Sequence, residues 1–152
     1  MTEQEIRRRL GRYLALRVEN ENRLERLARL KNNAELPAMR AGDGSQHTGS
    51  SGDRMARAVE AYLEYEDQIK PQIESNQREM AAIRAMVEAL QDPMEREVLR
   101  LRYMDGDSIR LNSWREIAYC LYGDDDERFV HACLRLQKRA VQSLEKVTNG
   151  ML

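Results

Sequence analysis

The sequence predicts an all-α protein in which a long antiparallel helical hairpin, coiled-coil-like, is followed by a C-terminal unit of three shorter helices. Three observations support this. Charged residues make up 34% of the 152 residues, with 8 glycines and 3 prolines, a composition typical of helical and elongated chains. Apolar residues recur at heptad spacing along one long segment. Three helix-start signals then follow one another after residue 91.

The first helix is expected to start at a T-x-x-E capping box formed by Thr2 and Glu5. Apolar residues then recur at spacings of three and four, as they do on one face of a helix. Polar residues, among them Arg17 and Asn20, interrupt that stripe.

We expect this helix to end at about Glu35, because the residue before a proline is disfavoured in helical geometry and Pro37 follows closely. The next stretch is rich in Gly and Ser and has no periodicity. It predicts a flexible loop over residues 37–53.

A second helix is expected from Asp53, and it carries an unbroken heptad seam. The seam positions are Met55, Val59, Tyr62, Glu66, Ile69, Ile73, Asn76, Met80, Ile83, Val87 and Leu90. The register stays in phase across Pro71, which favours one kinked helix over two separate ones. Asn76 either is partly exposed in a loosely packed hairpin or fixes the register and oligomeric state.

A seam of this length with no sheet to pack on needs another helix. The first helix is basic, because residues 1–40 hold ten Lys/Arg and six Asp/Glu, whereas residues 54–92 hold five against eight. Opposite charges suit an antiparallel hairpin of the two. The seam also favours a homodimer, and an intramolecular hairpin that uses the whole seam is the alternative.

The C-terminal unit is predicted from three start signals: Asp92 with Pro93 and Glu95, Ser113 with Glu116, and Asp124 with Glu127. Gly106 and Gly123 end the first two helices, and the last helix extends to about Thr148. We therefore expect two domains, the hairpin at residues 1–92 and the tri-helical unit at residues 93–148.

The last helix combines an apolar stripe with a basic face. Cys133 lies on the stripe, and Trp114 begins the buried face of the preceding helix. Basic side chains at spacings of three, four and seven share the opposite, exposed face. They are Arg128, His131, Arg135, Lys138 and Arg139.

The stretch "DPMEREVLRLRYMDG…SWREIAYCL…LQKRAVQSLEKV" resembles the fourth region of bacterial sigma factors. The matching residues are Val98-Leu99, Leu101-Arg102-Tyr103, Glu116-Ile117-Ala118 and Ala140-Val141…Leu144. The match covers roughly residues 90–147. Together with the helical N-terminal half, the layout is similar to that of the ArpU/RinA-like phage regulators, small prophage proteins that activate late genes.

The resemblance implies a helix-turn-helix unit and a phage or prophage-derived DNA-binding transcriptional regulator, acting on late packaging or assembly genes. Double-stranded DNA is the implied partner, with RNA polymerase as a further candidate. The short apolar runs and the charged first residues separately lead us to expect a cytoplasmic protein. The residues implied in DNA contact are Arg115, Arg128, His131, Arg135, Lys138 and Arg139. A sigma-like protein that binds core polymerase and has little DNA affinity is a related possibility.

The acidic turn, residues 124–127, favours a different class of function, because four carboxylates beside the third helix would repel phosphates unless they cap that helix. The alternative is a coiled-coil adaptor of phage packaging or assembly that uses the tri-helical unit for protein contacts. Neither function is enzymatic.

The sequence contains no phosphate-cradling Gly-rich motif and no arrangement of a nucleophile with a base. Cys120, His131 and Cys133 lack the spacing of metal ligands. Apolar runs are too short for a membrane span. We therefore expect no cofactor, metal, small-molecule substrate or membrane.

Overall fold

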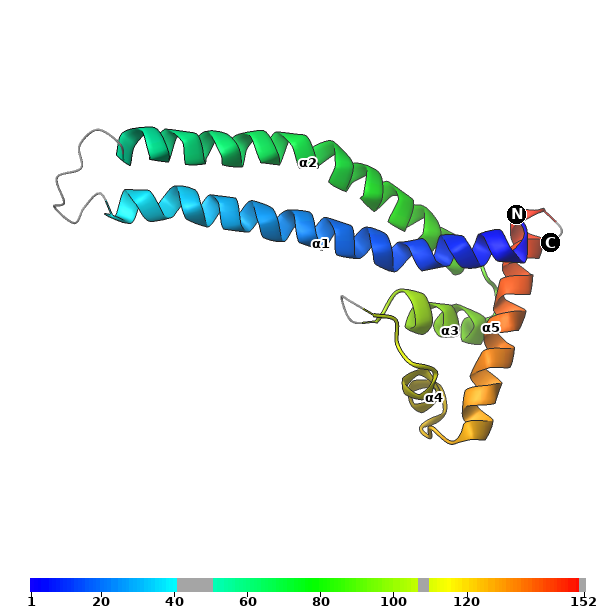
Figure 1. Ribbon diagram of the computed structural model, residues 1–152. Helices are drawn as coiled ribbons and strands as arrows, with labels where there is room; N and C mark the ends of the chain where they lie inside the picture. The colour runs from blue at the N-terminus through cyan, green and yellow to red at the C-terminus, as the bar shows by residue number, and fades with distance from the viewer. Residues whose placement is uncertain (41–50, 107–109, 151–152) are drawn as a thin grey trace. The chain divides into compact units, whose positions relative to one another are not determined.

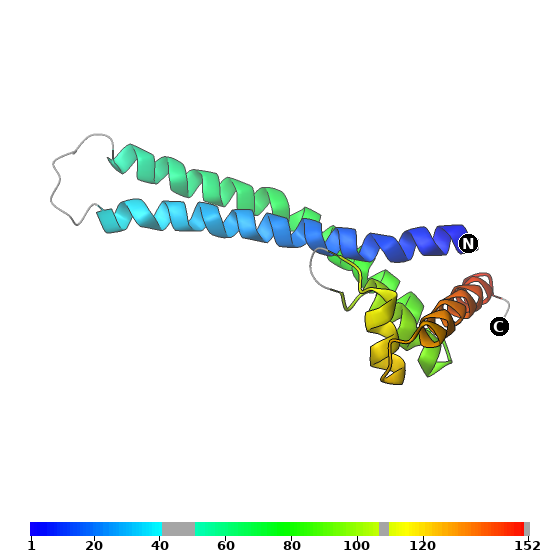
Figure 2. The same ribbon diagram turned by 60° about the horizontal axis from the view of Figure 1, so that its bottom comes forward.

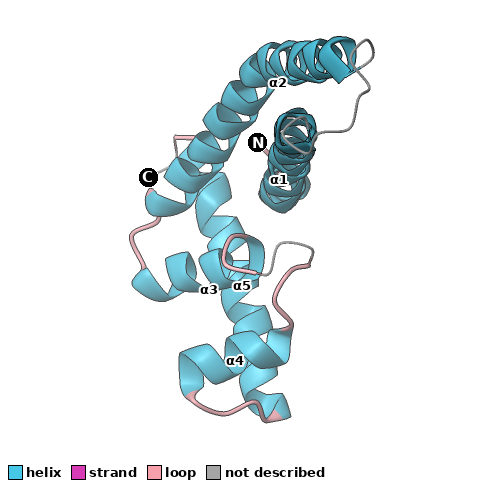
Figure 3. Ribbon diagram, turned by 90° about the vertical axis from the view of Figure 1, so that its left-hand side faces the viewer, coloured by secondary structure: helices cyan, strands magenta, loops and turns pink. Residues whose placement is uncertain are grey.

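The computed structural model describes residues 1–40, 51–106 and 110–150 of the chain (Figure 1). Within these ranges the structure has five helices and no strand (Figure 3). They are α1 (Glu3–Arg40), α2 (Ser51–Glu88), α3 (Pro93–Tyr103), α4 (Trp114–Tyr122) and α5 (Glu127–Thr148). The all-α class predicted from the sequence is confirmed.

The two long helices extend further than the sequence predicts. α1 continues to Arg40 through Pro37, because a proline near a helix end removes one backbone hydrogen bond and does not by itself end the helix. α2 already begins at Ser51 and continues through Pro71 as a single helix, as expected. The predicted loop, residues 37–53, is therefore helical at both ends, and its residues 41–50 lie outside the described residues.

Contacts divide the chain into two compact units. Unit 1 comprises Met1–Val18 and Gln77–Leu152, and unit 2 comprises Glu19–Asn76. The first turns of α1 and the last turns of α2 thus belong with α3, α4 and α5. This grouping by contacts differs from the division at residue 92 that the sequence suggests. The boundary at residue 92 stays a prediction about independently folding domains.

Unit 1 has a continuous apolar core. α3 and α4 both pack against α5 (Figure 2). Ile6 and Leu10, from the N-terminal turns of α1, belong to the same buried cluster. The fully buried side chains of this core come from every helix: Ile6, Leu10, Ile83, Val87, Leu90, Val98, Leu99, Ile117, Ala118, Cys133, Ala140, Val141 and Leu144. Burying a valine, leucine or isoleucine side chain of this core contributes roughly 1.5–3 kcal/mol.

Two polar contacts link α3 to α5 on the core side. Gln137 Nε2 donates to Tyr103 Oη at 2.7 Å, and both residues are buried. Ser143 Oγ donates to a carboxylate oxygen of Glu95 at 3.3 Å. Because Glu95 faces α5, it does not complete the capping box that its spacing suggests, and Asp92 caps α3 by accepting from Met94 N at 2.9 Å.

The starts of the next two helices follow their capping signals, with one difference. Ser113 and Glu116 form the predicted capping box of α4, which ends at Gly123 in the left-handed conformation, φ 73°. The N-cap of α5 is Asp126, not Asp124 as its spacing to Glu127 suggests. A carboxylate oxygen of Asp124 instead accepts a hydrogen bond from the backbone N–H of Asp126 at 3.0 Å, and this contact helps to hold the N-cap residue in place.

Unit 2 is packed far less tightly. Among its described side chains, Ile69 and Asn20 are buried below a tenth exposure, at 3% and 7%. Leu24 and Leu63 are each 50% exposed, and the seam residue Met55 is 38% exposed. The heptad pattern of unit 2 thus leaves much of its apolar surface uncovered in the single chain.

A pair of amides connects the two helices of unit 2. Asn76 Nδ2 donates to Asn20 Oδ1 at 3.0 Å. Asn76 is partly buried and Asn20 is buried, so each amide takes the other as its partner in the seam. This is the arrangement by which polar seam residues select one alignment of two helices.

Candidate nucleic-acid interface

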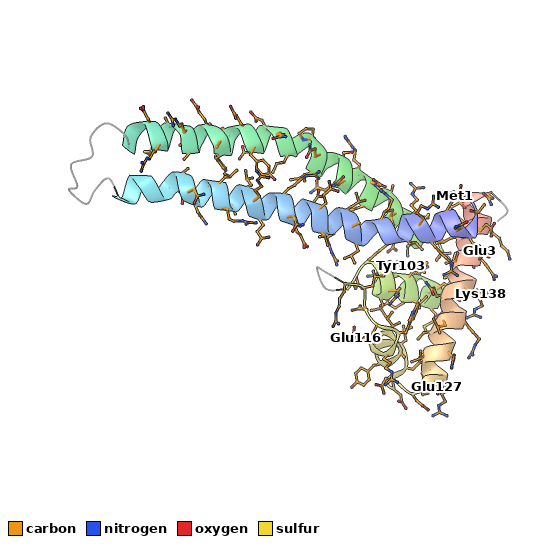
Figure 4. The ribbon with its side chains drawn as sticks, in the orientation of Figure 1. Met1, Glu3, Tyr103, Glu116, Glu127 and Lys138 are labelled. Carbon is orange, nitrogen blue, oxygen red and sulfur yellow. The ribbon has the colours of Figure 1, made fainter. Side chains whose placement is uncertain are left out.

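The basic face predicted for α5 lies on the solvent side of that helix. All five of its residues are exposed: Arg128, His131, Arg135, Lys138 and Arg139. The buried residues of α5, from Cys133 to Leu144, occupy the opposite side because they pack on α3 and α4. Figure 4 marks Glu127 at the start of α5 and Lys138 midway along it. The sequence therefore predicted the exposed face of α5 correctly.

Two basic side chains at the start of α5 lie beside acidic side chains of the same region. Arg128 Nε lies 3.3 Å from a carboxylate oxygen of Asp126, and its guanidinium lies 4.8 Å from the ring centre of Phe129. His131 Nε2 lies 3.5 Å from Glu127 Oε1. These contacts are exposed, so each contributes little to stability, but the Asp126 carboxylate reduces the positive potential around Arg128.

The middle of α5 carries cations that remain available. Arg135, Lys138 and Arg139 form no hydrogen bond or ion pair with any residue that the structure describes. Lys146, seven positions after Arg139 and also exposed, extends the face by two turns. The sequence prediction missed Lys146, although the seven-residue spacing could have identified it.

The exposed face of α4, the helix before α5 in the chain, combines a cation with aromatic rings. Arg115 is exposed, and Tyr119, four positions later on the same face, is 65% exposed. Tyr122 stacks on Phe129 of α5 with ring centres 5.3 Å apart. The two tyrosines were not predicted as site residues; their spacing from Arg115 is the signal that could have found them. Tyr hydroxyls are common donors to phosphate oxygens.

The acidic turn between α4 and α5 is exposed at Asp124, Asp125, Asp126 and Glu127. Capping uses Asp124 and Asp126, since the latter accepts from Glu127 N at 2.8 Å. Asp125 forms no hydrogen bond or ion pair with the described residues. The turn therefore keeps a local negative field beside the first turn of α5.

The two cysteines differ in environment. Cys133 is completely buried in the core of unit 1, and burial raises the pKa of its thiol. A thiol held protonated in this way is a poor nucleophile and a poor metal ligand. Cys120 is exposed. No group of three or more His, Cys, Asp or Glu residues gathers in a metal-binding arrangement within the described part of the chain.

Comparisons with protein-family models, with curated proteins and with solved structures found no match to this chain. None of the helices that the structure describes is long and apolar enough to cross a membrane.

Proposed function

We propose that the protein is a phage or prophage-derived transcriptional regulator that binds double-stranded DNA through α3, α4 and α5, acting on late genes. In this proposal α4 and α5 serve as a helix-turn-helix, and α5 is the recognition helix. The observation that carries it is the exposed basic face of α5, opposite a well-packed core. Such a face can neutralise several phosphates, which supplies most of the affinity in DNA binding.

The exposed face of α4 supports the same function. In helix-turn-helix proteins the helix before the recognition helix crosses the phosphate backbone, and Arg115 with Tyr119 offers a cation and a hydroxyl there. The contacts of Arg128 and His131 with carboxylates point to the middle of α5 as the stronger contact region. We therefore expect phosphate contacts to dominate over contacts to base edges.

The proposal extends to the other partners and to location. We propose that the protein is non-enzymatic and cytoplasmic and that it uses no cofactor. We also propose that its two long helices bind RNA polymerase or a second copy of the chain. Sedimentation over a range of protein concentrations tests the homodimer, and a mass that stays monomeric at every concentration removes it.

DNA binding is tested by fluorescence anisotropy with prophage late-promoter duplexes at several salt concentrations. We expect log K to fall steeply with log salt. The variant Arg135→Ala/Lys138→Ala/Arg139→Ala should reduce the slope by about 0.9 for each phosphate that the protein no longer neutralises.

The matched control is Arg7→Ala/Arg29→Ala/Lys31→Ala, which removes three exposed cations from α1 and changes the net charge equally. It should bind as the unchanged protein does. If the protein does not bind DNA at low salt, or if the two triple variants bind equally, the proposal is wrong.

A second candidate is a non-enzymatic adaptor of phage packaging or assembly. The exposed acidic turn favours it, because Asp125 forms no hydrogen bond or ion pair with described residues and is available to a basic protein partner. Affinity capture from induced cells separates the two functions. RNA polymerase in the eluate supports the regulator, whereas terminase or capsid proteins support the adaptor.

A further inference from the structure

The loop between α3 and α4 is held by a residue of α1. Arg17 Nη1 donates to the carbonyl of Met104 at 2.7 Å, and its Nη2 donates to the carbonyl of Gly106 at 2.8 Å. All three residues belong to unit 1. Carbonyls at the C-terminal end of a helix lack helical partners and carry partial negative charge, so a guanidinium there is well matched.

Gly106 lies close to the backbone of residues 110–112. A Cβ at Gly106 would lie 2.6 Å from the carbonyl oxygen of Arg110 and 3.1 Å from the backbone N of Asn112. The first distance is too short for any real contact, so a side chain at this position must displace the backbone that follows. Gly106 thus accepts a hydrogen bond from Arg17 and also lies against the residues that precede α4.

Further contacts continue from the loop to the first residue of α4. Asn112 Nδ2 donates to the carbonyl of Leu101 at 2.8 Å, and Arg102 Nη1 donates to the carbonyl of Asn112. The Arg102 guanidinium lies 4.7 Å from the centre of the Trp114 ring. Ser113, the N-cap of α4, stands between Asn112 and Trp114 in the chain, and Arg102 contacts both of these neighbours.

We propose that Arg17 is a positioning residue for α4. It fixes the loop, and the loop fixes Trp114 and so the direction in which α4 presents Arg115. This inference rests on the proposed DNA binding for its functional consequence. It adds that α1 is part of the DNA-binding apparatus, although Arg17 itself touches no DNA.

Trp114 provides a readout that is independent of DNA, because it is the single tryptophan of the chain. In Arg17→Met, which keeps an unbranched side chain and removes the guanidinium, we expect a red shift of the emission and stronger quenching by acrylamide. Far-UV circular dichroism should show unchanged helix content. Arg7→Met, at an exposed position of the same helix, is the matched control and should leave Trp114 unchanged.

DNA affinity is measured on the same variants. Arg17→Met removes both hydrogen bonds to the carbonyls of Met104 and Gly106, and we expect it to weaken DNA binding about tenfold. Arg17→Lys retains a cationic group that can donate to these carbonyls, and it should recover part of the affinity. A merely structural role would give no such graded recovery at unchanged helix content.

A double-mutant cycle with Gly106→Ala tests whether Arg17 acts through the loop. Both single variants should change Trp114 quenching, and the double variant should change it by less than their sum, because both disturb the same element. If Arg17→Met unfolds the protein, Gly106→Ala and Arg17→Lys still provide the comparison.

The outcomes separate the two proposals. A Trp114 signal that is unchanged in folded Arg17→Met, or fully additive effects in the cycle, overturns the positioning role whatever the protein binds. DNA affinity that is unchanged despite an altered Trp114 signal also overturns it. If the unaltered protein binds no DNA, the proposed function is wrong, and the Trp114 measurements still decide whether Arg17 positions α4.

Discussion

Unit 1 and unit 2 are both built from amphipathic helices, yet only unit 1 buries its apolar residues well in the described chain. In unit 1, α3, α4, α5 and the first turns of α1 cover one another from several directions. In unit 2, Ile69 is buried but Leu24 and Leu63 stay half exposed. Two helices form a single layer, and a single layer leaves flanking apolar positions in contact with water.

The largest test of this comparison is a leucine truncation in each unit. Leu144→Ala removes a completely buried side chain of unit 1, and we expect a loss of about 3 kcal/mol in the free energy of unfolding. Leu63→Ala in unit 2 should cost less than about 0.5 kcal/mol, because that side chain is half exposed. Urea denaturation followed by circular dichroism measures both. Equal losses would mean that unit 2 has a core that the single chain does not reveal.

The amide pair of unit 2 gives the next largest effect. Asn76→Leu leaves the buried Asn20 amide without its partner, which should cost about 1–2 kcal/mol in thermal denaturation. The double variant Asn20→Leu/Asn76→Leu should regain most of this, because no polar group remains unsatisfied, but it should lose the unique alignment of the helices. Asn22→Leu, at an exposed position of α1, is the control. A stabilised Asn76→Leu single variant would contradict the pairing.

Two glycines of unit 1 should respond with opposite signs. Gly123 has φ 73°, where an L side chain is strained, so Gly123→Ala should destabilise the protein by about 1 kcal/mol. Gly11 lies inside α1, and a Cβ at this position would have no neighbouring atom within 4 Å. Gly11→Ala should therefore stabilise the helix by about 0.5–1 kcal/mol. If the two variants shift the melting temperature in the same direction, the predicted difference between Gly123 and Gly11 is wrong.

The smallest effect concerns pH. A hydrogen bond from Arg12 lowers the pKa of Glu79, so the folded state binds this proton less tightly than the unfolded state does. The resulting stabilisation is present above the ordinary pKa range of Glu and is lost as the pH falls through the lowered pKa. Because the pair is largely exposed, Glu79→Gln should remove a few tenths of a kcal/mol of it. Denaturation at pH 7 and pH 3 measures the difference, and Glu74→Gln, which has no such partner among the described residues, should show none.

The sequence predicted what depends on local periodicity and capping. The all-α class, the start of α4 at Ser113 and the exposed basic face of α5 all follow from spacings within one helix. It did not predict contacts between distant segments. In the sequence Arg17 only interrupts an apolar stripe, whereas in the structure it binds the end of α3. Periodicity shows which residues share a face, but not whether another element covers that face, and so the exposure of Met55 in unit 2 could not be foreseen.

The two polar contacts between α3 and α5 have a consequence for recognition. Gln137 and Ser143 lie on the core side of α5, each held by a residue of α3. Turning α5 by one residue, about 100°, would break both contacts and bury charge. These contacts therefore hold α5 in one rotation about its axis, and that rotation sets which cations lie on its exposed face.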